Sequence, residues 1–354
     1  MTTASATAGP DLVEATLAAD GRRTREALLN HLLEDGLRAE LHELVADYPL
    51  RPGKGIRPAL CLATCRAYGG RNEDALPAAV AIELLHNAFL VHDDICDDAR
   101  LRRGAEALHV RHGIPRALSA GDALAWAALG PLLDHAAALR PQLAFDLLAE
   151  FDHLARRTIE GHALELDWRE RDLTGLDFDD YLRLVLGKTC WYSAIHPCRV
   201  GALLGSGGRA DLDPIARFGF FVGAVLQIRD DVENLTERSD SGKDFGSDII
   251  EGKPTLMLIH LLRTAPRATR DEALRLVGPA GERSGLAREE RIEGVIALME
   301  DSGSIDHACA YGDGIAGAAL AEFTPAMAGL PETRDKAFLR SLLLHLGDPA
   351  IRGR

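Results

Sequence analysis

Three aspartates stand close together in the segment Asp93-Asp94-Ile95-Cys96-Asp97. Residues three and four apart occupy neighbouring turns of a helix, so we expect all three carboxylates to share one face. Like charges at that spacing repel one another, and the cluster is therefore expected to bind a cation. Carboxylate oxygens suit Mg²⁺, which proteins usually hold with one or two carboxylates together with substrate phosphates. The alternative is a solvated acidic face, which the preceding apolar run over 82–91 disfavours because it is typical of a core helix.

A second acidic motif, Asp230-Asp231-Val232-Glu233-Asn234, repeats this spacing. On a helix Asp230, Asp231 and Asn234 share a face, and Gln227 lies one turn earlier on the same side. Two such faces on separate helices can hold one diphosphate through shared Mg²⁺ ions. Coincidence explains two matching motifs poorly, so the sequence predicts a Mg²⁺-dependent enzyme that acts on a diphosphate.

Basic residues lie at places that suit the binding of phosphate groups. Arg102-Arg103-Gly104 follows the first motif, and the glycine-rich turn over 53–58 carries two cations three residues apart. Arg can bind a diphosphate in a bidentate fashion, and Lys supplies a point charge. The turn is not a P-loop, because the spacing differs and no strand precedes it. Further charge lies at Lys188-Thr189 and in the glycine-bearing segment 242–253, which suits either a lid or an exposed linker.

The elements that must position these groups are helical. Apolar residues recur at helical spacing nearly throughout 21–262, Ala and Leu predominate, and no strand-turn-strand signal appears. Asp213-Pro214 is typical of a helix start and opens a long helix that carries the second motif. We therefore expect an all-α chain with a flexible N-terminal leader over 1–20 and one domain over 21–354.

Composition and charge exclude several classes of protein. The chain has 354 residues and a formal net charge of −14. This charge argues against a nucleic-acid partner, because proteins bind phosphate backbones through clusters of basic residues. Six cysteines in a chain of this length do not make a disulfide scaffold. We see no signal-peptide pattern and no uninterrupted apolar run near the ~20 residues that span a bilayer. The expectation is a cytoplasmic, reduced protein with no membrane span.

Five segments together resemble the trans-isoprenyl diphosphate synthase family, which includes the farnesyl and geranylgeranyl diphosphate synthases. They are Arg51 to Pro58, Leu85 to Gly104, Gly187 to Thr189, Gln227 to Asn234 and Gly242 to Leu256. The similarity runs in order from about residue 50 to residue 262, and the combination is highly specific. It implies the isoprenoid synthase fold, a single large helical bundle around a deep central cavity, usually assembled as a homodimer.

The resemblance also implies a role for each candidate residue. Mg²⁺ on the allylic diphosphate would be held by Asp93, Asp94, Asp97, Asp230 and Asp231. The same diphosphate would be contacted by Arg102, Lys188, Lys243 and Lys253. Isopentenyl diphosphate, the homoallylic partner, would be bound by Lys54, Arg57, His86 and Arg103. The reacting centre would be lined by Thr189 and Gln227.

The implied reaction lengthens a prenyl chain by one isoprene unit. Mg²⁺ and cations stabilise the leaving diphosphate, the allylic cation alkylates the double bond of isopentenyl diphosphate, and the released diphosphate is the implied base. Product length should depend on the helix before the first motif. Phe89 lies one turn, about 5.4 Å, before Asp93 and would form a floor, whereas Ala88 opens space. An ordinary core Phe is an equal alternative, and we expect a C15 to C20 product.

Two positions depart from the family pattern. Asn234 stands where an Asp is usual, although some geranylgeranyl synthases also have Asn there, so we expect one carboxylate fewer and an intact site. Glu233 lies one residue away and points elsewhere on a helix. His162 stands where the family often has Gln, and the sequence does not indicate what this changes.

Three other functions compete with chain elongation. A terpene cyclase on the same scaffold also ionises an allylic diphosphate, but it has no need for the second cluster of cations. A non-catalytic subunit of a heteromeric prenyl synthase tends to lose Asp-motif carboxylates, and this chain keeps five of the six. A plain helical interaction protein leaves the two acidic motifs and their matching cations unexplained.

Overall fold

The computed structural model describes residues 10–34, 38–171, 173–236 and 245–346. The first half of the chain forms α1 (Pro10–Glu34), α2 (Ala39–Leu50), α3 (Ile56–Ala67), α4 (Asn72–Cys96), β1 (Leu101–Arg102), β2 (Ala105–Glu106), α5 (Leu108–His112), α6 (Ile114–Ala127), α7 (Leu129–Ala138) and α8 (Pro141–Arg169). The second half forms the 3₁₀ turn η1 (Leu173–Gly175), α9 (Phe178–Val185), the π-helical segment η2 (Leu186–Ile195), α10 (His196–Gly205), α11 (Leu212–Thr236), α12 (Ser247–Glu251), α13 (Leu256–Thr264), α14 (Arg267–Leu276), α15 (Gly278–Glu282), α16 (Arg288–Asp301), α17 (Ser304–Ala326) and α18 (Arg334–Leu346).

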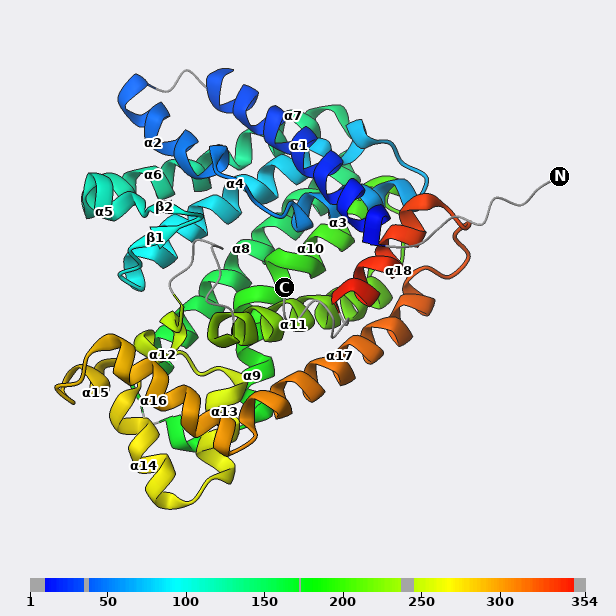
Figure 1. Cartoon of the computed structure of the whole chain (residues 1–354). Coiled ribbons are helices and arrows are strands. Elements are labelled where there is room, and N and C mark those ends of the chain that lie inside the picture. The colour runs from blue at the N-terminus through cyan, green and yellow to red at the C-terminus, as the bar shows by residue number, and fades with distance from the viewer. Residues whose placement is uncertain (1–9, 35–37, 172, 237–244, 347–354) are drawn as a thin grey trace.

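The predicted all-α architecture is confirmed, apart from one short hairpin. Helices α4, α8, α10 and α11 lie in the middle of the bundle, and α17 runs beside α11 (Figure 1). The short helices α12 to α16 gather at one end of the molecule, away from α1 and α2 (Figure 1). The depth of the predicted central cavity stays a prediction.

Two expectations about local structure need correction. Residues 10–20 are not a flexible leader, because they form the first part of α1 and bury Val13 against the core; residues 1–9 lie outside the described residues. A short antiparallel hairpin, β1 with β2, follows the first Asp motif although no strand was predicted. Two-residue strands are too short to show alternating hydrophobicity, and positive φ angles at Arg103 and Gly104 make the turn.

Helix α4 is the one described helix that is long and apolar enough to cross a membrane by length and composition. Two thirds of its most apolar window (67%) is buried inside the bundle, which is typical of a core helix. Acidic residues in its first turn favour the helix start, and the Asp74 carboxylate accepts a hydrogen bond of 2.8 Å from the backbone N–H of Arg71. The first Asp motif therefore stands at the end of a rigid, buried element.

Candidate active site

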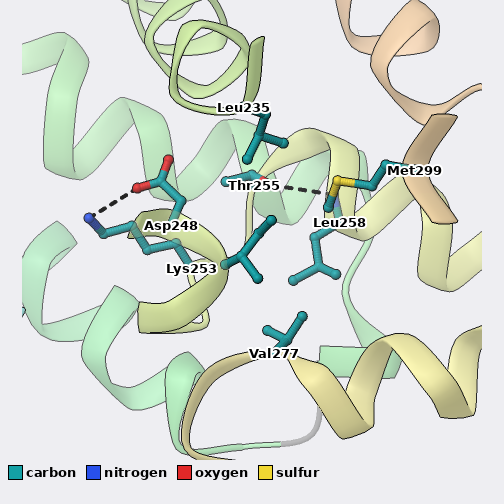
Figure 2. A pocket seen from close by; sticks show the side chains of 8 residues that line it. Leu235, Asp248, Lys253, Thr255, Leu258, Val277 and Met299 are labelled. Atoms are coloured by element: carbon teal, nitrogen blue, oxygen red, sulfur yellow. Dashed lines mark hydrogen bonds and ion pairs between the residues drawn. The ribbon is translucent and has the colours of Figure 1, made fainter. Parts of the chain in front are cut away.

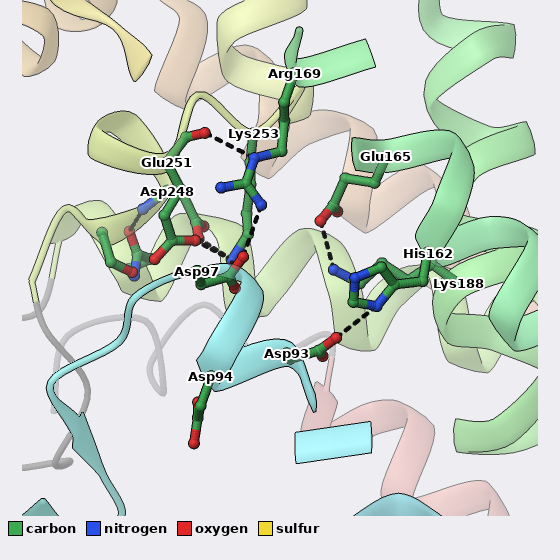
Figure 3. Close-up of polar contacts among 12 residues, drawn as sticks. Asp93, Asp94, Asp97, His162, Glu165, Arg169, Lys188, Asp248, Glu251 and Lys253 are labelled. Atoms are coloured by element: carbon green, nitrogen blue, oxygen red, sulfur yellow. Dashed lines mark hydrogen bonds and ion pairs between the residues drawn. The ribbon is translucent and has the colours of Figure 1, made fainter. Parts of the chain in front are cut away.

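The outer aspartates of the first motif, Asp93 and Asp97, face cationic side chains from distant helices (Figure 3). Nδ1 of His162 lies 2.6 Å from Oδ1 of Asp93. Nη1 of Arg169 lies 2.7 Å from Oδ1 of Asp97, and Nζ of Lys253 lies 3.1 Å from its Oδ2. Helix α8 and the residues just after α12 thus meet at the C-terminal end of α4.

The middle aspartate, Asp94, turns away from its two neighbours (Figure 3). It is fully buried, and both oxygens are engaged: Oδ2 accepts from the Tyr48 hydroxyl at 2.5 Å, and Oδ1 accepts from Nε of Arg102 at 2.9 Å. This corrects the expectation that all three carboxylates share one face. Successive residues on a helix are separated by 100°, and burial of Asp94 selects the inward direction.

The two aspartates of the second motif also differ in burial. Asp230 is exposed near the end of α11, whereas Asp231 is buried. Oδ1 of Asp231 accepts from Nε2 of Gln227 at 2.6 Å, and Oδ2 accepts from the Tyr181 hydroxyl at 2.9 Å. Oε1 of Gln227 in turn accepts from the Thr189 hydroxyl at 2.7 Å. Asp94 and Asp231, both predicted metal ligands, therefore have protein donors on both oxygens.

Lys188 lies where α8 and η2 pack very closely. Its ammonium is 2.6 Å from Oε1 of Glu165. A Cβ on Gly161 would come within 2.1 Å of the backbone nitrogen of Lys188, and Gly187 faces the same contact. Only glycine permits this approach, which brings Lys188 beside His162. π-Helical segments are rare and often occur at functional sites.

Charge compensation keeps the outer carboxylates ionised. Burial raises the pKa of Asp93, but Lys188 and the contact with His162 outweigh it, and the pKa lies below its usual value. Burial also opposes ionisation of Asp97, yet Lys253, Lys188 and Arg169 hold its pKa well below the usual range. The close contact with Asp93 raises the pKa of His162 to about 9. The site therefore presents two ionised carboxylates among cations.

Asn234 anchors the segment that carries Lys253. Its Nδ2 donates to Oγ of Ser247 at 3.1 Å, and its Oδ1 accepts from the backbone N–H of Asp248 at 3.3 Å. Nζ of Lys253 lies 3.3 Å from Oδ1 of Asp248 and 3.1 Å from Oδ2 of Asp97, so it links the two carboxylates. An Asp at position 234 could also accept from the Ser247 hydroxyl and from the Asp248 N–H, so these two contacts do not depend on the amide. Glu233 contacts Arg229 and lies 3.6 Å from Nζ of Lys54, so it does not replace the missing carboxylate.

A second group of cations lies around His86, two turns before Asp93 on α4. Arg57 donates to Oγ of Ser193 at 2.9 Å, and Arg103 donates to the backbone oxygen of Tyr48 at 3.1 Å. Burial, followed by Arg57 and Arg103, holds the pKa of His86 well below its usual range. Nδ1 of His86 and Nε of Arg57 are buried without a hydrogen-bond partner, and a buried polar atom in that state is costly. An anionic ligand would satisfy these donors.

The remaining predicted residues are placed as follows. Lys54 is largely exposed, beside Gly53, which faces the guanidinium of Arg103. Ala88 is fully buried, and the ring of Phe89 meets that of Tyr192 edge-on with centroids 5.9 Å apart. Lys243 lies outside the described residues.

The residues present fit a divalent cation that is completed by substrate oxygens. Among the residues that the structure describes, no three His, Cys, Asp or Glu gather into a ready metal site. Mg²⁺ commonly takes only one or two carboxylates and completes its shell with phosphate and water. Oδ1 of Asp93 is buried and, despite the 2.6 Å approach of His162, lacks a well-aligned hydrogen bond. That oxygen is a suitable hard ligand.

Two hollows in the described structure are lined mainly by apolar side chains. One is lined by Asp248, Lys253 and Thr255 and by apolar side chains that include Leu258, Val277 and Met299 (Figure 2). The other lies between α11 and α17 and is also lined mainly by apolar side chains. Neither includes an aspartate of the two motifs.

Four side chains of the site are not among the predicted residues: Tyr48, Glu165, Arg169 and Tyr181. His162, Glu165 and Arg169 follow one another at spacings of three and four, which is a helix-face signal that the sequence does contain. The two tyrosines have no such signal, because each reaches its aspartate from a different helix.

Comparisons with known proteins agree with the resemblance. A family model described as polyprenyl synthetase matches residues 38–292. A short chain isoprenyl diphosphate synthase of Methanothermobacter thermautotrophicus is 34% identical over 263 residues, covering 74% of this chain and 77% of that protein. A geranylgeranyl pyrophosphate synthase of Geoglobus acetivorans is 31% identical over 290 residues, covering 81% of this chain and 86% of that protein. The solved geranylgeranyl pyrophosphate synthetase from Pyrococcus horikoshii has a TM-score of 0.81 and 27% identity, covering 96% of this chain and 98% of that one.

Proposed function

This chain belongs to the polyprenyl synthetase family and is a trans-prenyltransferase, and we propose that it condenses isopentenyl diphosphate with an allylic diphosphate to give a short-chain, C15 to C20, product. The observation that carries the proposal is the presence of two groups of cations, one at the outer aspartates and one around His86, two turns earlier on α4. One surrounds Asp93 and Asp97, and the other contains Arg57 and Arg103. Two diphosphates can therefore bind at the same time.

The group around the outer aspartates binds the allylic diphosphate in this proposal. Lys188 and Lys253 now pair with protein carboxylates, and their ammonium groups can turn to the incoming phosphate oxygens. Members of the family use a divalent metal ion, and we propose Mg²⁺, held by Asp93, Asp97 and Asp230. When bound, it supplies positive charge to the leaving diphosphate. Gln227 and Thr189 then lie at the reacting centre, joined by their hydrogen bond.

The second group binds isopentenyl diphosphate. Arg57 and Arg103 lower the pKa of His86 along with burial, so the imidazole is neutral at neutral pH and can donate a hydrogen bond without added charge. Burial lowers the pKa of Arg103, although Glu83 opposes this, which is the expected result when a buried cation is only partly compensated. Bound phosphate oxygens would supply the missing negative charge.

One assay tests the proposed reaction. The purified chain is supplied with isopentenyl diphosphate and with C5, C10 or C15 allylic diphosphates, in the presence of Mg²⁺ or of a chelator. We expect Mg²⁺-dependent products of 15 to 20 carbons, a range set by the proposed C15 to C20 specificity. Turnover by the chain alone also excludes the role of a non-catalytic subunit. A hydrocarbon formed from geranylgeranyl diphosphate alone would instead identify a terpene cyclase.

Phe89 is expected to limit product length. Its ring packs on that of Tyr192 one turn below Asp93, so Phe89→Ala should open the path of the growing chain and add one or more isoprene units. Leu90→Ala, which removes a side chain of similar size from the adjacent face, is the matched control and should leave product length unchanged. Chromatography of dephosphorylated products measures both variants. An unchanged product from Phe89→Ala would reject the floor.

We also propose a homodimer, because α6, α7 and α8 carry large apolar side chains without partners in the described structure. Trp126 is 74% exposed, Phe145 68% and Leu133 55%. Large apolar side chains exposed on neighbouring helices are typical of protein interfaces. Wild-type protein should elute with the mass of a dimer in size-exclusion chromatography with light scattering. Trp126→Glu combined with Phe145→Glu should halve that mass, whereas Leu33→Glu on α1 should not; a monomeric wild type would reject the dimer.

A further inference from the structure

Two buried tyrosines contact Asp94 and Asp231, the buried second aspartate of each motif, which we call the inner aspartates. Tyr48 in α2 is 0% exposed and Tyr181 in α9 is 1% exposed. The Tyr48 hydroxyl donates to Asp94 at 2.5 Å, and the Tyr181 hydroxyl donates to Asp231 at 2.9 Å. Neither tyrosine has a part in the steps proposed above. The same arrangement thus occurs twice, on helices that are distant in sequence.

Each inner aspartate holds a side chain that handles substrate in the proposed function. Oδ1 of Asp94 accepts from Arg102, whose Nε is 2.9 Å away. Oδ1 of Asp231 accepts from Nε2 of Gln227 at 2.6 Å. The tyrosine, the aspartate and the substrate-handling side chain therefore form a continuous chain of hydrogen bonds in both motifs.

We propose that Tyr48 and Tyr181 are positioning residues: Tyr48 fixes the guanidinium of Arg102 through Asp94, and Tyr181 fixes the amide of Gln227 through Asp231. This inference rests on the proposed function, since it assigns Arg102 to the allylic diphosphate and Gln227 to the reacting centre. Neither tyrosine touches substrate.

The contacts of Tyr48 extend along the hairpin that carries the two arginines. Its hydroxyl accepts from the backbone N–H of Leu108 at 3.1 Å, and its backbone oxygen accepts from Arg103 at 3.1 Å. Arg51, stacked over the Tyr48 ring at 4.6 Å, donates to the backbone oxygen of Arg102 at 2.6 Å. Tyr48 and Arg51, which directly follows α2, thus hold the hairpin at both ends.

The contacts of Tyr181 determine which way the Gln227 amide points. An amide donates only through nitrogen and accepts only through oxygen. Asp231 accepts a hydrogen bond from the amide nitrogen of Gln227. The amide oxygen therefore faces the Thr189 hydroxyl, which donates to that oxygen at 2.7 Å. Tyr181 itself is well placed, because it lies in the first turn of α9, whose start is fixed by the Asp177 carboxylate accepting from the N–H groups of Asp179 and Asp180 at 3.0 Å.

Both hydroxyls remain donors at neutral pH. Burial, followed by Asp94, raises the pKa of Tyr48 well above its usual value. Burial and then Asp231 do the same for the pKa of Tyr181. Loss of either hydroxyl would leave a buried carboxylate with one donor fewer, a change that loosens the side chain held by the same carboxylate.

Three Tyr-to-Phe variants test the inference, because each removes one hydroxyl and keeps the ring. Tyr48→Phe should raise KM for the allylic diphosphate about 10- to 100-fold, with kcat changed less, and Tyr181→Phe should lower kcat by a similar factor with KM near its wild-type value. Tyr68→Phe is the matched control. Its hydroxyl donates to the backbone oxygen of Ala326 at 2.5 Å, outside the site, so it should change only Tm.

Two further measurements separate positioning from a loss of stability. Calorimetric titration with inorganic pyrophosphate and Mg²⁺ should show weaker binding for Tyr48→Phe, but unchanged binding for Tyr181→Phe and Tyr68→Phe. In a double-mutant cycle, Tyr181→Phe should have little further effect on kcat in a Gln227→Ala background. Lower Tm with unchanged KM, kcat and pyrophosphate affinity in both site variants would overturn the inference. Wild-type protein that binds pyrophosphate but forms no product would instead reject the proposed function.

Discussion

Asp93→Ala is expected to lower kcat by about 10²- to 10³-fold, the loss typical of removing one preorganised group that stabilises charge in the transition state. The carboxylate of Asp93 is half-buried and ionised, because Lys188 and His162 outweigh the effect of burial on its pKa. Its Oδ1 is the one motif oxygen that is buried without a well-aligned protein donor. Steady-state kinetics over a range of Mg²⁺ concentrations measure the effect, and the concentration for half-maximal rate should rise.

Asn234→Ala is the comparison for this prediction and should cost less activity. Its amide holds Ser247 and Asp248, so its loss loosens the segment before Lys253 without removing a carboxylate. We expect a lower Tm and a moderate rise in KM for the allylic diphosphate. Equal losses of kcat in Asp93→Ala and Asn234→Ala would contradict the ranking of the two motifs.

Arg103→Ala is expected to raise KM for isopentenyl diphosphate about 10- to 100-fold while KM for the allylic diphosphate changes little. A hydrogen bond to a charged group contributes about 1.5–3 kcal/mol, and each ~1.4 kcal/mol is a factor of ten in affinity. Arg103 has a positive φ of 51° and is held by the backbone oxygen of Tyr48, so its guanidinium is aimed by the hairpin. Initial rates with one substrate varied and the other saturating separate the two KM values.

Two controls sharpen the Arg103 experiment. Arg100→Ala removes an exposed cation three residues earlier and should leave both KM values near those of the wild type. Arg103→Lys keeps the charge but loses the planar fork, so it should restore only part of the affinity. If KM for the allylic substrate rose instead, Arg103 would be assigned to the binding of the allylic diphosphate. No effect on either KM would favour the cyclase alternative, which needs no second diphosphate site.

Much of the chemistry could be predicted from residue types and spacing. Apolar residues at helical spacing determined the all-α fold, and the two Asp motifs with their cations indicated a diphosphate substrate. These features are local: a helix repeats every 3.6 residues, so spacing alone says which side chains share a face. The short hairpin could not be predicted in this way, because its strands contain only two residues each.

Only the tertiary structure decided which aspartates are held by hydrogen bonds inside the protein and which face the cations of the site. Asp93 and Asp94 are the same residue type at adjacent positions, and nothing in their spacing distinguishes them. The difference comes from Tyr48 and Arg102, which reach Asp94 from other elements and satisfy both of its oxygens inside the protein. Tyr181 does the same for Asp231. A buried carboxylate is stable only when its donors are in place, and those donors come from parts of the chain that folding brings together.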